Sequence, residues 1–201
     1  RTFDGKKILE DVSFQLSQGI YAIKGNPGCG KTTLIMLMMG LIRPDSGTIR
    51  VMGKSPYENE IEMKKNIGFC PSEDYFFEGM SARKNMQYIS TTRTGKPQSY
   101  HSLMSLIKEF SLDDELDFPL EAYRKSDSKI IQLIACMIGY PKILIWDEPF
   151  FNQGNKKNKK ILKILNYARK HCKLIVYSCS HPEFTDEIAD CTLTLNHGKI
   201  K

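Results

Sequence analysis

The sequence has 201 residues, of which 41% are hydrophobic and 26% are charged, and its formal net charge is +6. This length suits one α/β domain with room for an inserted subdomain, and the composition is that of an ordinary soluble globular protein with a full core. The longest apolar run, residues 130–140, is interrupted by Gln132 and is too short to cross a bilayer. The chain is therefore not expected to span a membrane.

The positive charge is densest at residues 156–160, where lysines open a predicted helix. The first interpretation is a solvent-exposed helix face, and attraction to an anionic membrane surface is the alternative. No aromatic or glycine-rich nucleic-acid motif accompanies these lysines. Nucleic acid is therefore not expected among the partners.

The six cysteines are scattered through apolar or motif segments and form no C-x-x-C pair, which argues against a zinc site or a disulfide framework. We interpret them as the reduced thiols of a cytosolic protein. Cys29 differs from the others because it lies at the start of a predicted helix, and a helix N-terminus lowers the pKa of a thiol and makes it reactive.

In chain order, the first predicted elements are strands. Residues 6–16 alternate loosely between apolar and polar side chains and predict antiparallel strands at an edge of the fold. Phe3 lies upstream of them. Its ring is expected either to stack on a nucleotide base or to pack locally, and the sequence leaves both interpretations open.

Residues 25–33, GNPGCGKTT, match the phosphate-binding pattern G-x-x-x-x-G-K-[ST] at every fixed position. Residues 19–24 predict a short strand before the motif and residues 33–39 predict a helix after it, which is the context that the motif requires. The glycines let successive backbone N–H groups point inward, and the helix adds its positive N-terminal end. A chance glycine-rich turn is the alternative, and the flanking elements argue against it.

This motif predicts a nucleotide-phosphate site. Lys31 is expected to reach the β- and γ-phosphates and to act in catalysis, and the hydroxyl of Thr32 is expected to ligate Mg²⁺. The residues of the motif that are expected to bind the nucleotide are Asn26, Pro27, Gly28, Cys29, Gly30, Lys31, Thr32 and Thr33.

The middle of the chain is predicted to be helical. The elements expected after the first helix are a strand, a short helix, a strand and then three helices, at residues 48–52, 58–65, 67–70, 81–92, 99–110 and 130–138. We therefore expect a single domain in which a helical subdomain, at about residues 72–140, is inserted into a core built from residues 1–71 and 141–201.

Residues 142–149, KILIWDEP, predict a buried parallel strand that delivers two carboxylates to the edge of the sheet where open α/β sheets bind ligands. Asp147 is expected to hold Mg²⁺, and Glu148 is expected to accept a proton from an attacking water. An acidic pair that merely ends a strand is the alternative, and the phosphate-binding motif upstream argues against it. His181, after another apolar run at residues 173–178, is either a contact to the γ-phosphate or a loop histidine without a role.

With these pieces in this order, the chain resembles the nucleotide-binding domain of an ATP-binding-cassette (ABC) transporter over nearly all of its length. The resemblance assigns Phe3 to the base-stacking aromatic position, residues 25–33 to the Walker A loop and Asp147 to the end of Walker B. It makes Glu148 the catalytic glutamate and His181 the switch histidine. It implies an α/β fold with a P-loop NTPase core, in which helices flank a mainly parallel sheet with an antiparallel β edge, and an inserted α-helical subdomain.

The resemblance also implies what the chain works with. In that family two nucleotide-binding domains enclose two ATP molecules, and hydrolysis drives membrane-spanning partners. ATP and Mg²⁺ are thus the expected cofactors, a transmembrane permease subunit and a second ATPase subunit are the expected partners, and the expected location is cytoplasmic, peripheral on the inner face of the cell membrane. Residues 75–77, YFF, lie where the family docks its membrane subunit, with local packing as the alternative.

Three positions depart from the family pattern. Residues 123–127, YRKSD, stand where the family has the signature L-S-G-G-Q, Ser72 stands where it has the Q-loop glutamine, and Gly154 where it has the D-loop aspartate. The groups that bind ATP within the chain are present, whereas those that it should lend to a partner's ATP are degraded. We therefore expect a heterodimer with a non-identical ATPase subunit, with a homodimer as the alternative.

The function that follows is ATP binding and hydrolysis that powers a membrane transporter, with export as the expected direction. The alternative is a nucleotide-binding regulatory or assembly module with little hydrolysis of its own, which the degraded signature favours and the intact Glu148 and His181 oppose.

Overall fold

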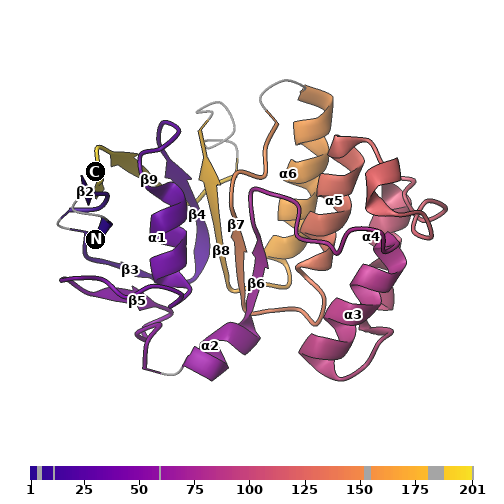
Figure 1. The fold of residues 1–201 in the computed structure, drawn as a ribbon, viewed down its shortest axis with the longest axis horizontal. Coiled ribbons are helices and arrows are strands. Elements are labelled where there is room, and N and C mark those ends of the chain that lie inside the picture. The colour runs from indigo at the N-terminus through magenta and orange to yellow at the C-terminus, as the bar shows by residue number, and fades with distance from the viewer. Residues whose placement is uncertain (4–5, 11, 59, 152–154, 181–187, 201) are drawn as a thin grey trace.

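The computed structural model describes the chain except residues 4–5, 11, 59, 152–154, 181–187 and 201. Its centre is a six-stranded sheet with the strand order β10-β9-β4-β8-β7-β6 (Figure 1). The strands of this sheet are β4 (Gly19–Lys24), β6 (Ile67–Cys70), β7 (Ile143–Trp146), β8 (Leu174–Cys179), β9 (Cys191–Asn196) and β10 (Lys199–Ile200).

All neighbours in this sheet are parallel except β10, which pairs antiparallel with β9. The register places Lys24 opposite Cys179, and Trp146 between Cys70 and Tyr177. The carboxyl ends of β4, β6, β7 and β8 therefore meet at one edge of the sheet. Strands β7 and β8 are buried along their whole length, which explains why the sequence shows continuous apolar runs there rather than alternation.

Two smaller sheets lie at the N-terminal side. Strand β1 (Thr2–Phe3) pairs antiparallel with β2 (Lys6–Lys7), whereas β3 (Phe14–Leu16) pairs parallel with β5 (Ile49–Val51). The prediction of antiparallel strands in residues 6–16 is thus right for β2 and wrong for β3. The reason is that β4 and a helix lie between β3 and β5 in the chain, and such a crossover brings the second strand back in the same direction as the first.

Helices cover both faces of the central sheet (Figure 1). Helix α1 (Lys31–Met38) packs on one face with β3 and β5, in a core that includes Ile23, Leu34 and Val176. Helix α6 (Asn155–Arg169) packs on the other face. A short helix, α2 (Glu60–Asn66), leads into β6.

The segment between β6 and β7 is largely helical, as the sequence predicts. Its elements are α3 (Ala82–Thr94), the 3-10 helix η1 (Ser99–Leu103), α4 (Met104–Glu109), the 3-10 helix η2 (Leu120–Ala122) and α5 (Lys125–Ala135). These helices share one hydrophobic core with α6 and the nearer sheet face, and the indole N–H of Trp146 in β7 donates to the sulfur of Cys136 at 2.9 Å. We keep the division into a core and a helical subdomain as a proposal. None of the described helices is long and apolar enough to cross a bilayer.

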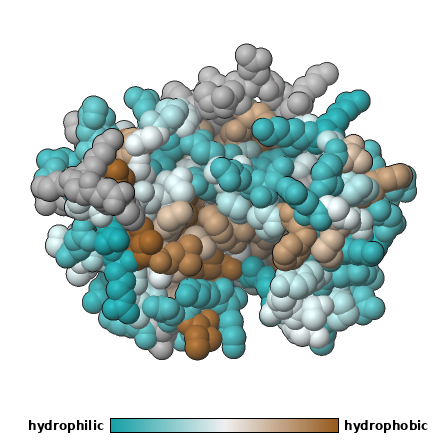
Figure 2. Space-filling view, in the orientation of Figure 1, coloured by the Kyte–Doolittle hydropathy of each residue, from teal (hydrophilic) through white to brown (hydrophobic). Residues whose placement is uncertain are grey.

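The face seen in Figure 2 carries a band of hydrophobic residues across its middle, in the region between α1 and α4. Of residues 75–77, only Phe77 is strongly exposed, at 51%, and its ring meets that of Tyr88 edge-on, with centroids 5.1 Å apart. Phe76 is buried, and the hydroxyl of Tyr75 donates to the backbone carbonyl of Gln132. Local packing therefore accounts for Tyr75 and Phe76, and Phe77 is the aromatic residue of this segment that faces outward.

Candidate functional site

The loop between β4 and α1 begins and ends at glycines whose positions only glycine suits. A Cβ atom on Gly25 would lie 2.5 Å from the sulfur of Cys29 and 2.5 Å from the carbonyl oxygen of Leu195. Gly30 has φ +105° and serves as the N-cap of α1. These close approaches hold the loop as a tight curl, and the start of α1 that follows it has first-turn N–H groups without intrahelical partners.

Lys31 occupies the centre of this curl. Its ammonium group donates to the carbonyl oxygens of Gly25 at 2.7 Å and Asn26 at 3.1 Å, and the residue is only 5% exposed. A buried cation without compensation would be costly, so these carbonyls are part of what keeps the charge in place. The loop therefore presents a fixed positive charge beside the N-terminus of a helix.

Thr32 connects the loop to the neighbouring acidic strand end. Its hydroxyl donates to Oδ2 of Asp147 at 2.8 Å. Asp147 follows β7 and is 1% exposed, and its backbone N–H donates to the carbonyl of Cys70 at 2.9 Å. The sequence prediction that these two residues lie together as metal ligands is consistent with this contact, since hydroxyl and carboxylate oxygens are ligands that Mg²⁺ accepts.

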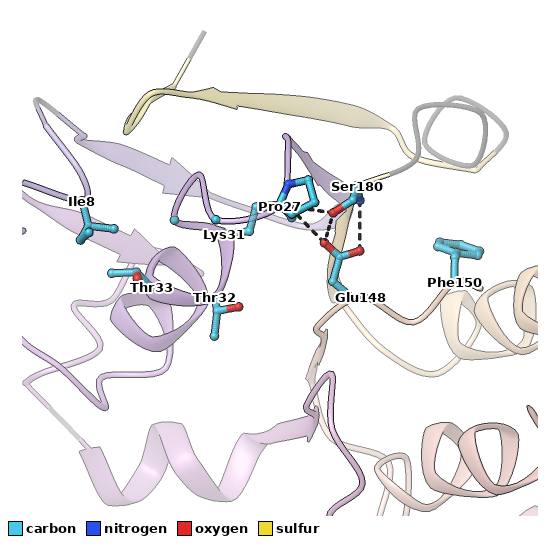
Figure 3. A pocket seen from close by; sticks show the side chains of 10 residues that line it. Ile8, Pro27, Lys31, Thr32, Thr33, Glu148, Phe150 and Ser180 are labelled. Atoms are coloured by element: carbon cyan, nitrogen blue, oxygen red, sulfur yellow. Dashed lines mark hydrogen bonds and ion pairs between the residues drawn. The ribbon is translucent and has the colours of Figure 1, made fainter. Parts of the chain in front are cut away.

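Glu148 faces Lys31 across the site. Its Oε1 lies 3.1 Å from the ammonium of Lys31. The same oxygen accepts a 2.5 Å hydrogen bond from the hydroxyl of Ser180, and Oε2 accepts one from the backbone N–H of Ser180 at 3.0 Å. Figure 3 shows this carboxylate directed at Ser180 and Lys31, away from Phe150.

Lys31, Thr32, Glu148 and Ser180 line a pocket of about 800 Å³, and Asp147 is buried behind Thr32. Its lining is Ile8, Pro27, Gly28, Gly30, Lys31, Thr32, Thr33, Glu148, Phe150 and Ser180 (Figure 3). Asn26 and Cys29, which the motif also predicts as nucleotide-binding residues, instead line a neighbouring cavity of about 750 Å³ with Thr194 of β9 and His197 of the turn after it. Pro27 and Gly28 line both cavities.

The donor set of the larger pocket fits a magnesium-bound triphosphate. Backbone N–H groups at a helix start and a lysine ammonium suit phosphate oxygens, while Thr32 and Asp147 offer oxygen ligands within hydrogen-bond distance of each other. Within the described residues, no cluster of three or more histidine, cysteine or acidic side chains offers a competing metal site. The residues present therefore fit both Mg²⁺ and the nucleotide.

The loop after β6 is held by α5. Lys129, 7% exposed, donates to the carbonyls of Pro71 at 2.5 Å and Ser72 at 3.1 Å. The side-chain amide of the fully buried Gln132 accepts from the N–H of Tyr75. Burial raises the pKa of the Cys70 thiol to about 12, partly opposed by the neighbouring Lys129 ammonium, so this thiol stays protonated. Ser72 itself is exposed.

The N-terminus of α5 is built differently from that of α1. Its N-cap residue, Arg124, makes no side-chain capping hydrogen bond, and Arg124 and Lys125 are exposed. Ser126 is buried, at 5% exposure. A carboxylate oxygen of Asp127 lies 3.9 Å from the ammonium of Lys160. This helix start presents long cationic side chains where the resemblance implies small residues.

Three predicted positions lie outside what the structure describes. His181 and Gly154 fall in the undescribed segments, and Phe3 is described only as part of β1, without its side chain. The roles expected for Phe3 and His181 stay predictions. By contrast, the structure brings Lys31, Thr32, Asp147 and Glu148 together as expected.

The sequence reasoning missed Ser178 and Ser180. Both contact the predicted acids: the hydroxyl of Ser178 donates to Oδ1 of Asp147 at 2.5 Å, and Ser180 binds the carboxylate of Glu148. The signal available in the sequence is two hydroxyl residues, at alternate positions, ending an otherwise apolar strand.

Comparisons with known proteins all lead to ABC transporter proteins. A family model described as ABC transporter matches residues 9–151. The chain is similar to the human protein ATP-binding cassette sub-family A member 10, with 25% identity over 100% of this chain and 14% of that protein. It is also similar to the sulfate/thiosulfate import ATP-binding protein CysA of Pseudomonas aeruginosa, with 26% identity over 100% of this chain and 63% of that protein. The lipoprotein-releasing system ATP-binding protein LolD of Leptospira interrogans is 25% identical over 93% of this chain and 82% of its own length.

The chain thus spans less than two thirds of the length of the first two relatives. A solved structure of the ATP-binding subunit of an ABC transporter matches with a TM-score of 0.85 at 21% identity, over 99% of this chain and 84% of that one. At this identity the likeness concerns the fold. It agrees with the expected α/β core, mainly parallel sheet and helical insertion.

Proposed function

Because the chain belongs to the ABC transporter family, we propose that it binds and hydrolyses ATP to power a membrane transporter, together with an ATPase subunit of different sequence. The observation that carries the proposal is the single hydrogen-bonded network of Lys31, Glu148 and Ser180 beside the contact of Thr32 with Asp147. It joins a phosphate-binding loop to two acids from a distant strand.

The chain's own residues have separable roles in this proposal. The loop amides and Lys31 bind the β- and γ-phosphates, and Thr32 and Asp147 would hold Mg²⁺, which offsets charge on the phosphate oxygens when bound. Glu148 orients the attacking water and takes its proton. The water oxygen forms the new bond to the γ-phosphorus, while the bond to the bridging oxygen breaks and its electrons stay with ADP.

The Oε1 of Glu148 lies 3.1 Å from the ammonium of Lys31. A γ-phosphate competes with Glu148 for the same ammonium, since both are anions attracted to its charge. Binding of ATP therefore releases the Glu148 carboxylate from Lys31, and a water can then take up the freed acceptor position.

A non-identical ATPase partner is supported by the start of α5. Two exposed cationic side chains, Arg124 and Lys125, stand where the family presents small groups to the opposite nucleotide, and their long side chains cannot copy the close approach of glycine. A homodimer would contain two sites with this defect. A heterodimer would contain one complete site, formed by this chain's pocket and the partner's signature loop.

A transmembrane partner is supported by the exposed aromatic pair Phe77 and Tyr88. The location proposed is the cytoplasmic face of the cell membrane, and the direction proposed is export. The relatives include both a sulfate/thiosulfate import protein and a lipoprotein-releasing system, so the direction is tested by measuring transport in vesicles with the purified complex.

The proposal is tested by purifying the chain from its native membrane under mild conditions and identifying the proteins that accompany it. We expect a membrane-spanning subunit and a second ATPase subunit, and ATP hydrolysis that is at least about tenfold faster in the complex than in the chain alone. Recovery of a homodimer with full activity contradicts the heterodimer. Recovery without any membrane subunit contradicts the transport role.

The second candidate, a regulatory module that binds ATP but hydrolyses little, is favoured by the altered signature position. The variant Glu148→Gln separates the two. If Glu148 is the general base, the variant loses about 10²- to 10⁴-fold in turnover and keeps ATP binding, whereas Glu109→Gln, an exposed glutamate paired with Lys163, changes nothing. Equal, very slow turnover in wild type and Glu148→Gln supports the regulatory module instead.

A further inference from the structure

Strand β8 lies between β4, which leads into the phosphate loop, and β7, which leads into the acids. Its end therefore stands between the two halves of the site. Ser178 lies in the last part of this strand and Ser180 directly follows it, and the strand is otherwise mostly apolar. No catalytic step described so far requires either of them.

Ser178 is fully buried and makes two hydrogen bonds with the acidic pair. Its hydroxyl donates to Oδ1 of Asp147 at 2.5 Å and accepts the backbone N–H of Glu148 at 2.8 Å. Oδ1 of Asp147 is thereby occupied, and the other carboxylate oxygen, Oδ2, faces Thr32. Ser178 therefore helps to fix the orientation in which the Asp147 carboxylate presents its second oxygen to the phosphate loop.

The same serine supports an unusual backbone. Glu148 has φ +47°, a left-handed conformation that costs a residue other than glycine on the order of 1 kcal/mol or more. The hydrogen bond from its N–H to Ser178 holds this conformation. The result is that two successive acids, which would point to opposite faces in a regular strand, both contribute to one site.

Ser180 acts on the side chain of Glu148. It donates to both carboxylate oxygens, from its hydroxyl at 2.5 Å and from its N–H at 3.0 Å. Its hydroxyl oxygen also accepts from the ammonium of Lys31 at 3.0 Å. When a γ-phosphate takes the ammonium of Lys31, these two donors on Ser180 still fix the orientation of Glu148.

The geometry points to Ser178 and Ser180 as positioning residues for the proposed ATPase reaction: Ser178 orients Asp147 toward the magnesium ligand Thr32, and Ser180 orients Glu148 toward the attacking water. This inference rests on the proposed function. It assigns to the end of one strand the alignment of both acids, each through a separate hydroxyl.

The test of Ser180 compares Ser180→Ala with Ser180→Thr in the purified complex. Hydrogen bonds to charged groups contribute about 1.5–3 kcal/mol, so we expect Ser180→Ala to lower kcat by about 10- to 100-fold while KM for ATP changes less than about threefold. Ser180→Thr keeps the hydroxyl and should restore most of the rate. An unchanged kcat in Ser180→Ala, a loss confined to KM, or no rescue by threonine overturns the role of Ser180.

The test of Ser178 uses binding rather than turnover. The affinity for a non-hydrolysable ATP analogue is measured by calorimetry twice, once in Mg²⁺ and once in a chelator. The ratio of the two affinities is the gain that Mg²⁺ provides. We expect Ser178→Ala to reduce this gain by about tenfold and to leave binding without Mg²⁺ unchanged, and Ser178→Thr to retain the gain. An equal loss in both conditions overturns the role, because general destabilisation of the pocket would not depend on the metal.

Ser90 offers a matched control. It is also fully buried and its hydroxyl accepts the N–H of Tyr100 at 3.1 Å, but it lies in α3, in the helical segment rather than at the site. Ser90→Ala should lower the melting temperature as much as Ser178→Ala and leave kcat and the magnesium effect unchanged. If Ser90→Ala changes the kinetics as much as the alanine variants of Ser178 and Ser180 do, the changes in all three variants reflect lost stability, and the inference is overturned.

Failure of the inference and failure of the proposed function are distinguishable. A wild-type complex that binds no ATP contradicts the proposed function and this inference with it. A wild-type complex that binds and hydrolyses ATP, beside serine variants that do the same, contradicts the inference alone. If the complex binds ATP without hydrolysing it, the role of Ser180 is rejected. The role of Ser178 is then decided by the calorimetric comparison with and without Mg²⁺.

Discussion

The starts of α1 and α5 are two helix N-termini in one chain, and they differ in every feature that matters for phosphate. At α1, glycines curl the backbone, Lys31 is buried among carbonyls and Thr32 contacts Asp147. At α5, the cap residue Arg124 has an exposed side chain and makes no capping hydrogen bond. Both helix starts have the same dipole direction, so the backbone shape and the side chains around each start are what distinguish them.

Replacing residues 123–127 with Leu-Ser-Gly-Gly-Gln removes the long cationic side chains at the start of α5 and tests the difference between the two helix starts most directly. If the altered sequence is what prevents self-pairing, the variant should form ATP-dependent dimers and hydrolyse ATP about 100-fold faster than the wild-type chain alone, the effect of one restored group of oxyanion donors. Light scattering and steady-state hydrolysis measure the two results. The two glycines cost the helix about 1 kcal/mol each, so the melting temperature is recorded in parallel, and a stable variant without any gain contradicts the explanation.

Removing the positive charge of Lys31 tests the other half of the comparison, the start of α1. Lys31→Ala should weaken binding of magnesium-ATP by about 10- to 100-fold, because a buried charged donor contributes about 1.5–3 kcal/mol. Calorimetry measures the affinity. Lys64→Ala, an exposed lysine paired with Glu60 in α2, should leave it unchanged, and equal affinities in all three proteins would reject the loop as the phosphate site.

A smaller effect is expected from Thr32→Val, which removes a hydroxyl with little change in volume. The contact with Asp147 is lost, and the concentration of Mg²⁺ needed for half-maximal ATP binding should rise by about tenfold. Thr92→Val serves as the control, since the Thr92 hydroxyl donates only to backbone carbonyls in the exposed part of α3. A magnesium requirement that does not change would remove Thr32 from the metal site.

The smallest effect concerns the exposed ring of Phe77. Phe77→Ala removes a half-exposed ring whose edge-on contact with Tyr88 contributes about 0.5–1.5 kcal/mol beyond the burial of its area, so the free energy of unfolding should fall only modestly. ATP binding should not change, but transport by the reconstituted complex should fall. Intact transport in this variant would argue against Phe77 as a contact with the membrane subunit.

The parts of the site that the sequence predicts are those encoded in consecutive residues. The motif at residues 25–33 carries its turn, its lysine and its hydroxyl together, and residues 142–148 carry both strand and acids. Ser178 and Ser180 escaped prediction because their role depends on β8 lying between β4 and β7. Strand order is a long-range property that no local pattern encodes.

The same limit applies to the fold. The type of most elements follows from local periodicity, but the parallel pairing of β3 with β5 depends on the crossover through β4 and α1. The attachment of the loop after β6 to α5, through Lys129 and Gln132, joins segments nearly 60 positions apart, with sequence separations of 57 and 58. Lys129 and Gln132 lie in a mostly apolar helix, and their local sequence does not predict that they bind the loop after β6.

The chain's one tryptophan offers a spectroscopic consequence. Trp146 directly precedes Asp147, is fully buried, and donates its indole N–H to the sulfur of Cys136 from the helical segment. Intrinsic emission excited at the indole band therefore arises from a single place, on the boundary between sheet and helices and one peptide bond from Asp147 of the proposed nucleotide site. Any rearrangement of that boundary on adding nucleotide would alter the emission without a label, which makes the native fluorophore a reporter for titrations and stopped-flow measurements.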